Sequence, residues 1–180
     1  MLGFLLRITK TFKHPETYFT LYNALVRSQL EYAVVVWNPL YSEYSDKIES
    51  IQRIFLRALQ HRVGHPNISY DASLCEYGVN TLDNRRSFLE LMVLYNICHS
   101  HYHCPELLMQ IGLHVPNRVT RSCPLFSVAR SRTNAGVRAP LRRMCLRYKE
   151  TWPAWTSLLM QGLYIEQAWK QFFAKCRHSA

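Results

Sequence analysis

Apolar residues recur every three or four positions along most of the 180-residue chain, which is the spacing of helices. Regular alternation of apolar and polar residues, the pattern of a half-buried strand, is scarce. The spacing predicts helices over residues 2–12, 15–37, 44–62, 72–77, 81–98, 141–149 and 165–176, with a brief amphipathic segment at 105–113. We therefore expect an all-α fold, an antiparallel helical bundle followed by further helices and a long basic loop.

Proline and glycine mark several helix ends. Pro15 is expected to open the second helix, because the backbone N–H at the first helical position has no intrahelical acceptor and its loss in proline costs nothing. Pro39 is expected to end that helix at Trp37, since the residue before a proline avoids helical geometry. Gly78 is expected to end the short fourth helix as its cap. A short loop joins the second and third helices, so they are expected to pack antiparallel.

The same spacing predicts which side chains face inwards. The apolar stripe of the second helix comprises Phe19, Tyr22, Val26, Leu30, Ala33 and Trp37. In the third helix the apolar positions are Ile48, Ile51, Phe55 and Ala58, with Glu49, Arg53 and Arg57 on another face. In the fifth helix the residues that mostly share a face are Leu82, Arg85, Phe88, Met92, Tyr95 and Cys98.

The composition, 48% hydrophobic and 19% charged, is that of one ordinary globular domain or two small ones that share a core. We divide the chain into a helical bundle at 1–63, a middle helical region at 64–115, a basic loop at 116–140 and C-terminal helices at 141–180. Residues 116–139 lack any period and are rich in loop-forming residues, and loops of that length are usually functional or disordered.

Positive charge is concentrated in one segment. The chain has 22 Lys and Arg against 12 Asp and Glu, and residues 118–149 hold nine basic residues and no acidic one. Soluble surfaces usually mix signs, and the planar guanidinium fits phosphate, so this segment predicts phosphate binding rather than a merely solvated surface. The candidates are Arg118, Arg121, Arg130, Arg132, Arg138, Arg142, Arg143, Arg147 and Lys149.

Enzymatic chemistry has little support in the sequence. The glycine-rich phosphate motifs and the common hydrolase motifs are absent, and the only aspartates are Asp46, Asp71 and Asp83, none adjacent to another. The run "CHSHYHC" offers Cys98, His101 and Cys104 as weak metal ligands. Zinc ligands usually come as two close pairs separated by a loop, whereas these Cys and His residues all lie at one helix end. We therefore expect a frayed helix terminus, no metal and no cofactor.

The sequence features that bear on cellular location favour the cytoplasm or nucleus. The apolar run Tyr32 to Trp37 is six residues long, whereas a membrane helix needs about 20. The first residues include Arg7 and Lys10 and lack a signal-peptide cleavage site. Six cysteines without a C-x-x-C are expected to be free thiols in a reducing compartment. We expect an intracellular chain that does not span a membrane.

The strings "LGFLLRITKTFKHPETYFTLYNALVRSQLEYAVVVWNPLYSEYSDKIESIQRIFLRAL", "TLDNRRSFLELMVLYNI" and "VPNRVTRS…RTNAGVRAPLRRMC" carry a family resemblance. They resemble the C-terminal part of reverse transcriptases of jockey-type non-LTR retrotransposons. The first string is similar to the thumb that follows the polymerase palm, and the later ones to the helical region beyond it. The residues after about Glu150 match nothing in that family.

The resemblance implies a fragment that binds RNA or an RNA/DNA duplex through phosphates, with Arg53 and Arg57 on the duplex side and the missing palm as a further partner. That palm carries an aspartate pair that this chain lacks, so the chain alone is not expected to be an RNA-directed DNA polymerase. The alternatives are a helical protein-interaction module and a decayed remnant without selected function. The oligomeric state and the choice between RNA and DNA stay open.

Overall fold

The computed structural model describes residues 1–12, 14–39, 41–64, 68–114 and 125–159, with the backbone alone of Thr11 and of residues 151–159. Helices dominate these residues, and the only β feature among them is an isolated bridge between Leu113 and Phe126. The all-α fold expected from the sequence is confirmed. Over the same ranges, no helix combines the length and the apolar character that crossing a membrane would require.

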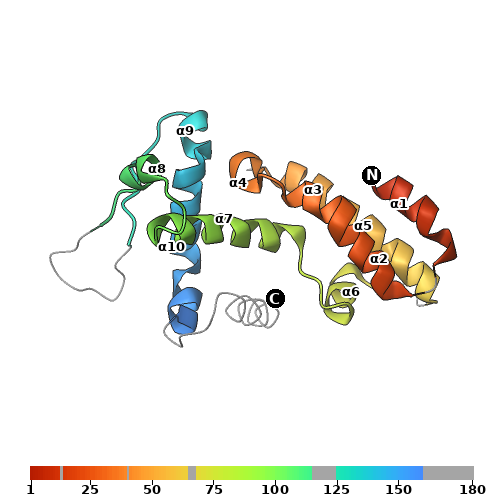
Figure 1. Cartoon of the computed structure of the whole chain (residues 1–180). Coiled ribbons are helices and arrows are strands. Elements are labelled where there is room, and N and C mark those ends of the chain that lie inside the picture. The colour runs from red at the N-terminus through yellow and green to blue at the C-terminus, as the bar shows by residue number, and fades with distance from the viewer. Residues whose placement is uncertain (13, 40, 65–67, 115–124, 160–180) are drawn as a thin grey trace. The chain divides into compact units, whose positions relative to one another are not determined.

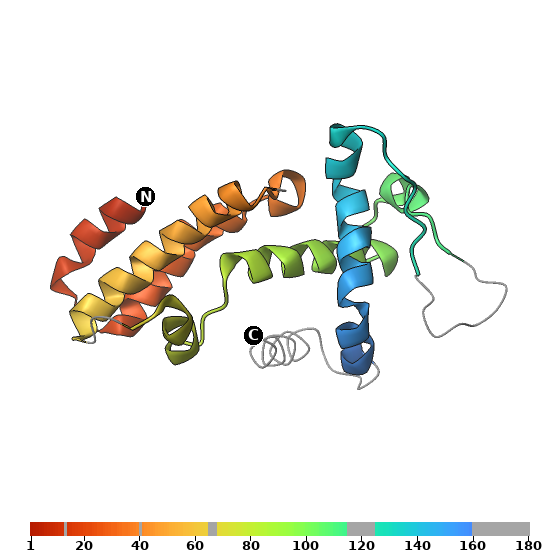
Figure 2. The same cartoon turned by 180° about the vertical axis from the view of Figure 1, so that it is seen from behind.

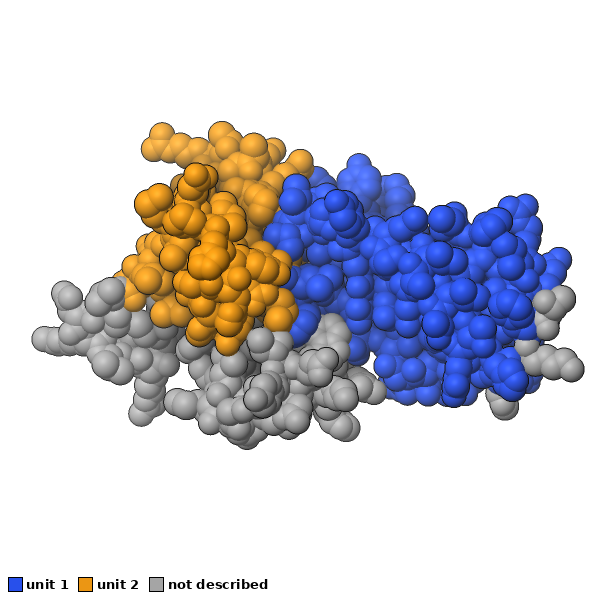
Figure 3. Space-filling model, in the orientation of Figure 1, with its two compact units in different colours: residues 1–89 blue, residues 90–180 orange. Residues whose placement is uncertain are grey.

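Two compact units make up the chain, residues 1–89 and residues 90–180 (Figure 3). Their boundary lies inside helix α7 (Leu82–Cys98). Residues 64–89 thus belong with the N-terminal helices and residues 90–115 with the C-terminal ones. We call them unit 1 and unit 2 and describe each by itself.

The helices of unit 1 are α1 (Leu2–Ile8), α2 (Pro15–Tyr22), α3 (Ser28–Glu31), α4 (Val34–Trp37), α5 (Ser42–Val63) and α6 (Tyr70–Glu76), with a 3-10 turn at Thr9–Thr11 and a π-helical stretch, η2, at Asn23–Arg27. α5 lies along α2 (Figure 1). The guanidinium of Arg62 lies 4.7 Å from the Tyr18 ring, and Tyr22 stacks on Phe55 at 4.0 Å, so α2 and α5 are antiparallel, as expected.

The core of unit 1 lies where α1, α2 and η2 meet α5. Its buried side chains are Leu5, Tyr18, Tyr22, Val26, Phe55, Leu56 and Leu59. Phe19 packs edge-on against Phe55 at 5.4 Å. Burial raises the pKa of Tyr22, because the charged phenolate would lose its hydration in this core.

The second helix is not continuous, and the prediction of one helix over 15–37 is wrong. Tyr32 is extended and Ala33 is left-handed, with φ 50° and ψ 26°. Trp37 Nε1 donates a hydrogen bond of 2.6 Å to the Tyr32 carbonyl, which holds α4 in this turned position. Ala33 and Trp37 are therefore exposed instead of completing the apolar stripe.

The predicted helix ends agree well with the structure. Pro15 opens α2, α4 ends at Trp37 before a non-helical Asn38, and Gly78 is left-handed, with φ 61°, two residues after α6. Left-handed geometry suits glycine because it has no Cβ to clash with the backbone.

The side chain of Glu49 is buried, whereas Arg53 and Arg57, placed on the same face of the helix by their spacing, are exposed. Its carboxylate accepts the Leu82 backbone N–H, at 3.0 Å to Oε2, and the Tyr70 hydroxyl. A carboxylate at this position favours the helix, because the first N–H groups of a helix lack intrahelical partners. Burial, together with the hydrogen bond to Glu49, raises the pKa of Tyr70.

Unit 2 contains the second half of α7, then α8 (Pro105–Met109), α9 (Asn134–Arg138) and α10 (Pro140–Leu159). α10 crosses the C-terminal half of α7 in both views (Figures 1 and 2). α9 lies inside the stretch expected to be loop, and α10 extends beyond the predicted helix at 141–149. Residues 115–124 and the predicted helix at 165–176 lie outside the described residues.

The buried face of α7 differs from the predicted one. Leu82 and Phe88 are buried as expected, but Arg85, Met92, Tyr95 and Cys98 are only partly buried. The buried side chains of α7 include two charged ones, Arg86 in unit 1 and Glu90 in unit 2, together with Leu91, Leu94 and Ile97. The spacing of apolar residues did not reveal that the charged residues Arg86 and Glu90 are buried, because their burial depends on polar partners elsewhere in the chain.

Candidate nucleic-acid interface

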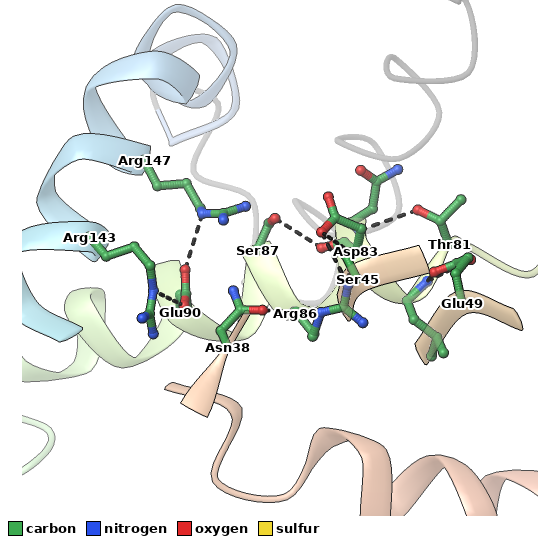
Figure 4. Close-up of polar contacts among 12 residues, drawn as sticks. Asn38, Ser45, Glu49, Thr81, Asp83, Arg86, Ser87, Glu90, Arg143 and Arg147 are labelled. Carbon is green, nitrogen blue, oxygen red and sulfur yellow. Dashed lines mark hydrogen bonds and ion pairs between the residues drawn. The ribbon is translucent and has the colours of Figure 1, made fainter. Parts of the chain in front are cut away.

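Two of the candidate arginines face the interior of unit 2. Arg143 and Arg147 lie one turn apart on α10, so both reach the same carboxylate, that of Glu90 on α7 (Figure 4). Arg143 Nε is 2.7 Å from Glu90 Oε1, and Arg147 Nε is 3.1 Å from Glu90 Oε2. The Glu90 side chain is fully buried, at 0% exposure.

The basic segment thus has an acidic partner that its own sequence does not contain. Glu90 lies 53 positions before Arg143, outside any window that a charge count would use. Within the fold, Glu90 relieves the positive charge of Arg143 and Arg147. A buried charge needs a close partner, and here one carboxylate serves two guanidiniums.

Four other candidate residues lack such a partner in the part of the chain that the structure describes. Arg130, Arg132 and Lys149 are exposed, Arg142 is partly buried, and none of these four has an ion pair among the described residues. We call Arg130, Arg132, Arg142 and Lys149 the outer basic set. Arg138 is also exposed, and its carbonyl accepts a bond from Arg143. Arg118 and Arg121 lie outside the described residues.

The basic residues of helix α10 lie on two neighbouring faces of the helix. Arg142 and Lys149 are seven residues apart, about two turns, and share one face of the helix. Arg143 and Arg147 lie on the neighbouring face, which contacts Glu90. The helix therefore presents an inner, neutralised basic face and an outer one with no acidic partner in the part of the chain that the structure describes.

Arg53 and Arg57 are exposed on α5 in unit 1, where an external phosphate could reach them. The Arg53 guanidinium lies over the Tyr70 ring, 5.0 Å from its centre, which fixes its direction without neutralising it. Their assignment to a duplex stays a prediction.

Sequence reasoning missed Arg86, a buried arginine of unit 1. Arg86, 1% exposed, donates to Asn38 Oδ1 at 3.1 Å and to Ser45 Oγ at 2.6 Å, and pairs with Asp83 at 3.2 Å (Figure 4). Arg85 forms a two-pronged pair with Glu31, with Nη2 at 2.9 Å from Oε2. A local signal for Arg86 is Asp83, three positions earlier on the same helix, a spacing at which opposite charges can pair.

The His and Cys residues after α7 form no metal site among the described residues. The helix ends at Cys98, and the rings of His99 and His101 pack near Tyr95, at 4.1 and 6.0 Å between ring centres. Burial raises the pKa of Cys98 and so favours the thiol over the thiolate that binds metals. Among the described residues, Cys98, His101 and Cys104 are not grouped as metal ligands.

Comparison with known proteins found no matching family model, no matching curated protein and no matching solved structure.

Proposed function

We propose that this chain binds single-stranded or duplex nucleic acid without sequence preference, through phosphate contacts. The outer basic set carries the proposal. Arg143 and Arg147 are neutralised inside unit 2 by Glu90, whereas Arg130, Arg132, Arg142 and Lys149 have no acidic partner among the described residues. Unrelieved like charges repel one another, and a polyphosphate backbone removes that repulsion and releases counterions.

The proposal agrees with the family resemblance of the sequence, because in that family the thumb holds RNA or an RNA/DNA duplex while the palm performs the chemistry. No catalytic step is proposed for the chain alone. Guanidinium groups and an ammonium bind the backbone, so affinity is expected to be nearly the same for unrelated sequences.

Fluorescence anisotropy with two unrelated single-stranded RNAs of equal length tests this function. Four phosphate contacts predict a slope of log affinity against log salt of about −3 for single strands. Both RNAs should give the same slope and similar affinity. A flat salt response from a sample whose circular dichroism is helical would contradict the proposal.

A second candidate function, docking of a partner protein, is favoured by one observation in unit 1. Phe4, Ile8 and Phe12 recur at intervals of four along and just after α1, and they are exposed at 52%, 53% and 41%. Such stripes mark interaction sites more often than scattered apolar residues do. In the family that the sequence resembles, the palm is the expected occupant.

Co-elution with a jockey-type palm supplied as a separate chain tests this second function. Wild-type protein should co-elute, and Ile8→Glu should not, with unchanged thermal stability because Ile8 is exposed. Val63→Glu, at an exposed apolar position of α5, is the matched control and should behave as wild type. Equal behaviour of the two variants would exclude the α1 stripe as the docking surface.

A further inference from the structure

A cavity of about 360 Å³ lies within unit 2, at the start of α10. This volume is within the range of pockets that hold small organic ligands. Apolar side chains form much of its wall, and two basic side chains also line it. These lining residues include Ile111, Val128, Leu141 and Cys145, with Arg130 and Arg142 as the basic pair.

The guanidinium of Arg142 is held in place at this cavity and is not fully satisfied. One end donates to the Ala129 carbonyl, which fixes the side chain. Its Nε is buried and has no hydrogen-bond partner among the described residues. Buried N–H groups are nearly always paired in folded proteins, and a charged one most of all. The missing acceptor points to an anionic group that binds here.

Arg130 adds a second positive charge to the same cavity. Its side chain is exposed and forms no ion pair within the part of the chain that the structure describes. Two guanidiniums can hold one phosphate by several charge-assisted hydrogen bonds, which are stronger than neutral ones.

The backbone shapes the opposite wall. The Ser127 N–H donates to the Gly112 carbonyl at 2.8 Å, and a Cβ added to Gly112 would lie 2.9 Å from the Ser127 carbonyl oxygen. Only glycine permits this approach, so the two segments are fixed side by side. The cavity is therefore a feature of the folded backbone as well as of its side chains.

We propose that this cavity binds one nucleotide unit, with its phosphate on Arg130 and Arg142 and its base against the apolar wall. A phosphate alone would make no contact with the apolar wall of the cavity, and an apolar ligand alone would leave the two arginines without an anionic partner. This inference rests on the proposed function, since it names where a nucleic-acid strand inserts a base. A base inside a duplex cannot enter, so single strands and strand ends are the preferred ligands.

Titration of the full chain, labelled with nitrogen-15, by adenosine 5′-monophosphate tests the inference. We expect shifts of the backbone amides of Gly112, Ser127 and Leu141. Adenosine and inorganic phosphate are the matched probes, and each should bind at least about tenfold more weakly, because each lacks half of the interactions.

Variants distinguish binding in the cavity from attraction by the positive charge of the whole segment. Arg130→Gln should weaken binding of adenosine monophosphate about tenfold while the protein stays folded, because Arg130 is exposed. Arg132→Gln removes the same charge from the same segment at a residue that does not line the cavity, and should leave this binding unchanged. Arg142→Gln should also weaken binding of adenosine monophosphate. If Arg142→Gln does not fold, the result for Arg130→Gln alone tests the inference.

The outcomes distinguish the inference from the function on which it rests. If RNA binds with the expected salt slope but the nucleotide causes no shifts at the cavity, the inference is wrong and the proposed function stands. Equal binding of phosphate and nucleotide would also overturn it, because the base would then make no contact. If RNA binding is independent of salt, the proposed function fails, whatever the nucleotide does.

Discussion

The Nε of Arg143 lies 2.7 Å from Oε1 of Glu90, whose side chain is fully buried in unit 2. Arg147 contacts the other oxygen of the same carboxylate at 3.1 Å. One negative charge therefore holds two positive ones, both from α10, against α7. Such an arrangement contributes little over apolar packing, yet removal of one partner is costly because it leaves charge without compensation.

Glu90→Gln is therefore expected to destabilise the protein by about 3–5 kcal/mol, since it leaves two guanidiniums without a counter-charge. Urea unfolding followed by circular dichroism measures this change. Glu106→Gln, which removes the same charge from an exposed site on α8 in the same unit, is the matched control and should cost less than about 1 kcal/mol. A neutral result for Glu90→Gln would mean that the ion pair does not form.

Joint replacement of Glu90, Arg143 and Arg147 by apolar residues of similar volume should cost much less than Glu90→Gln alone. The reason is that no buried charge is left in the triple variant. The same urea measurement decides this. A triple variant that loses as much stability as Glu90→Gln would show that packing, rather than charge compensation, dominates at this position.

Glu49→Gln is expected to destabilise the helical packing of unit 1 by about 2 kcal/mol. The carboxylate accepts both the Leu82 N–H and the Tyr70 hydroxyl, and hydrogen bonds to a charged group contribute more than neutral ones. Hydrogen exchange of the first amides of α7 should become faster. Glu43→Gln, at an exposed position on the same helix, should leave both stability and exchange unchanged.

The ends of α5, α6 and α7 follow from local signals in the sequence, and the structure agrees with them to within about two residues. The buried charges do not follow. Glu49, Arg86 and Glu90 lie on faces that their charge would assign to solvent, and each is satisfied by a group far along the chain. Such pairs depend on tertiary contacts that periodicity does not contain.

The basic segment shows the same limit at the candidate site. Composition correctly marked it as free of acidic residues, but it treated all nine basic residues alike. Only the fold separates Arg143 and Arg147, which contact Glu90, from the outer basic set. The break at Ala33 was equally hidden, since alanine favours helix and the hydrogen bond from Trp37 that holds the turn is not a sequence signal.

Ala33→Gly is expected to stabilise the protein by about 0.5–1 kcal/mol. Ala33 is left-handed, a geometry that penalises a Cβ and that glycine adopts freely. Ala72→Gly, at an exposed helical position in α6, is the matched control and should destabilise by about the same amount. The opposite signs are measurable in urea, and destabilisation by both would contradict the left-handed turn.

Stability should fall at high pH because of Cys145. Burial raises the pKa of this thiol to about 11 in the folded protein, above its ordinary value of 9.0. The unfolded chain therefore loses its proton first, so the contribution is complete below pH 9 and is lost as the pH rises through about 11. Its size is on the order of 3 kcal/mol.

Urea midpoints measured from pH 8 to pH 11 should decline less for Cys145→Ala than for wild type. Tyr148 adds to the decline above pH 10, because burial raises its pKa to about 12. Cys75→Ala, which removes an exposed thiol, should follow the wild-type curve. Parallel curves for wild type and Cys145→Ala would show that this thiol titrates normally.

The salt dependence of RNA binding by a variant of the outer basic set tests the central claim most directly. Replacement of Arg130, Arg132 and Lys149 by glutamine should reduce the magnitude of the log–log slope from about 3 to about 1 for a single-stranded RNA, with unchanged helix content. Lys47→Gln, at a lysine already paired with Glu43, should keep the wild-type slope. If the triple variant binds with the wild-type slope and affinity, the outer basic set is not the nucleic-acid interface.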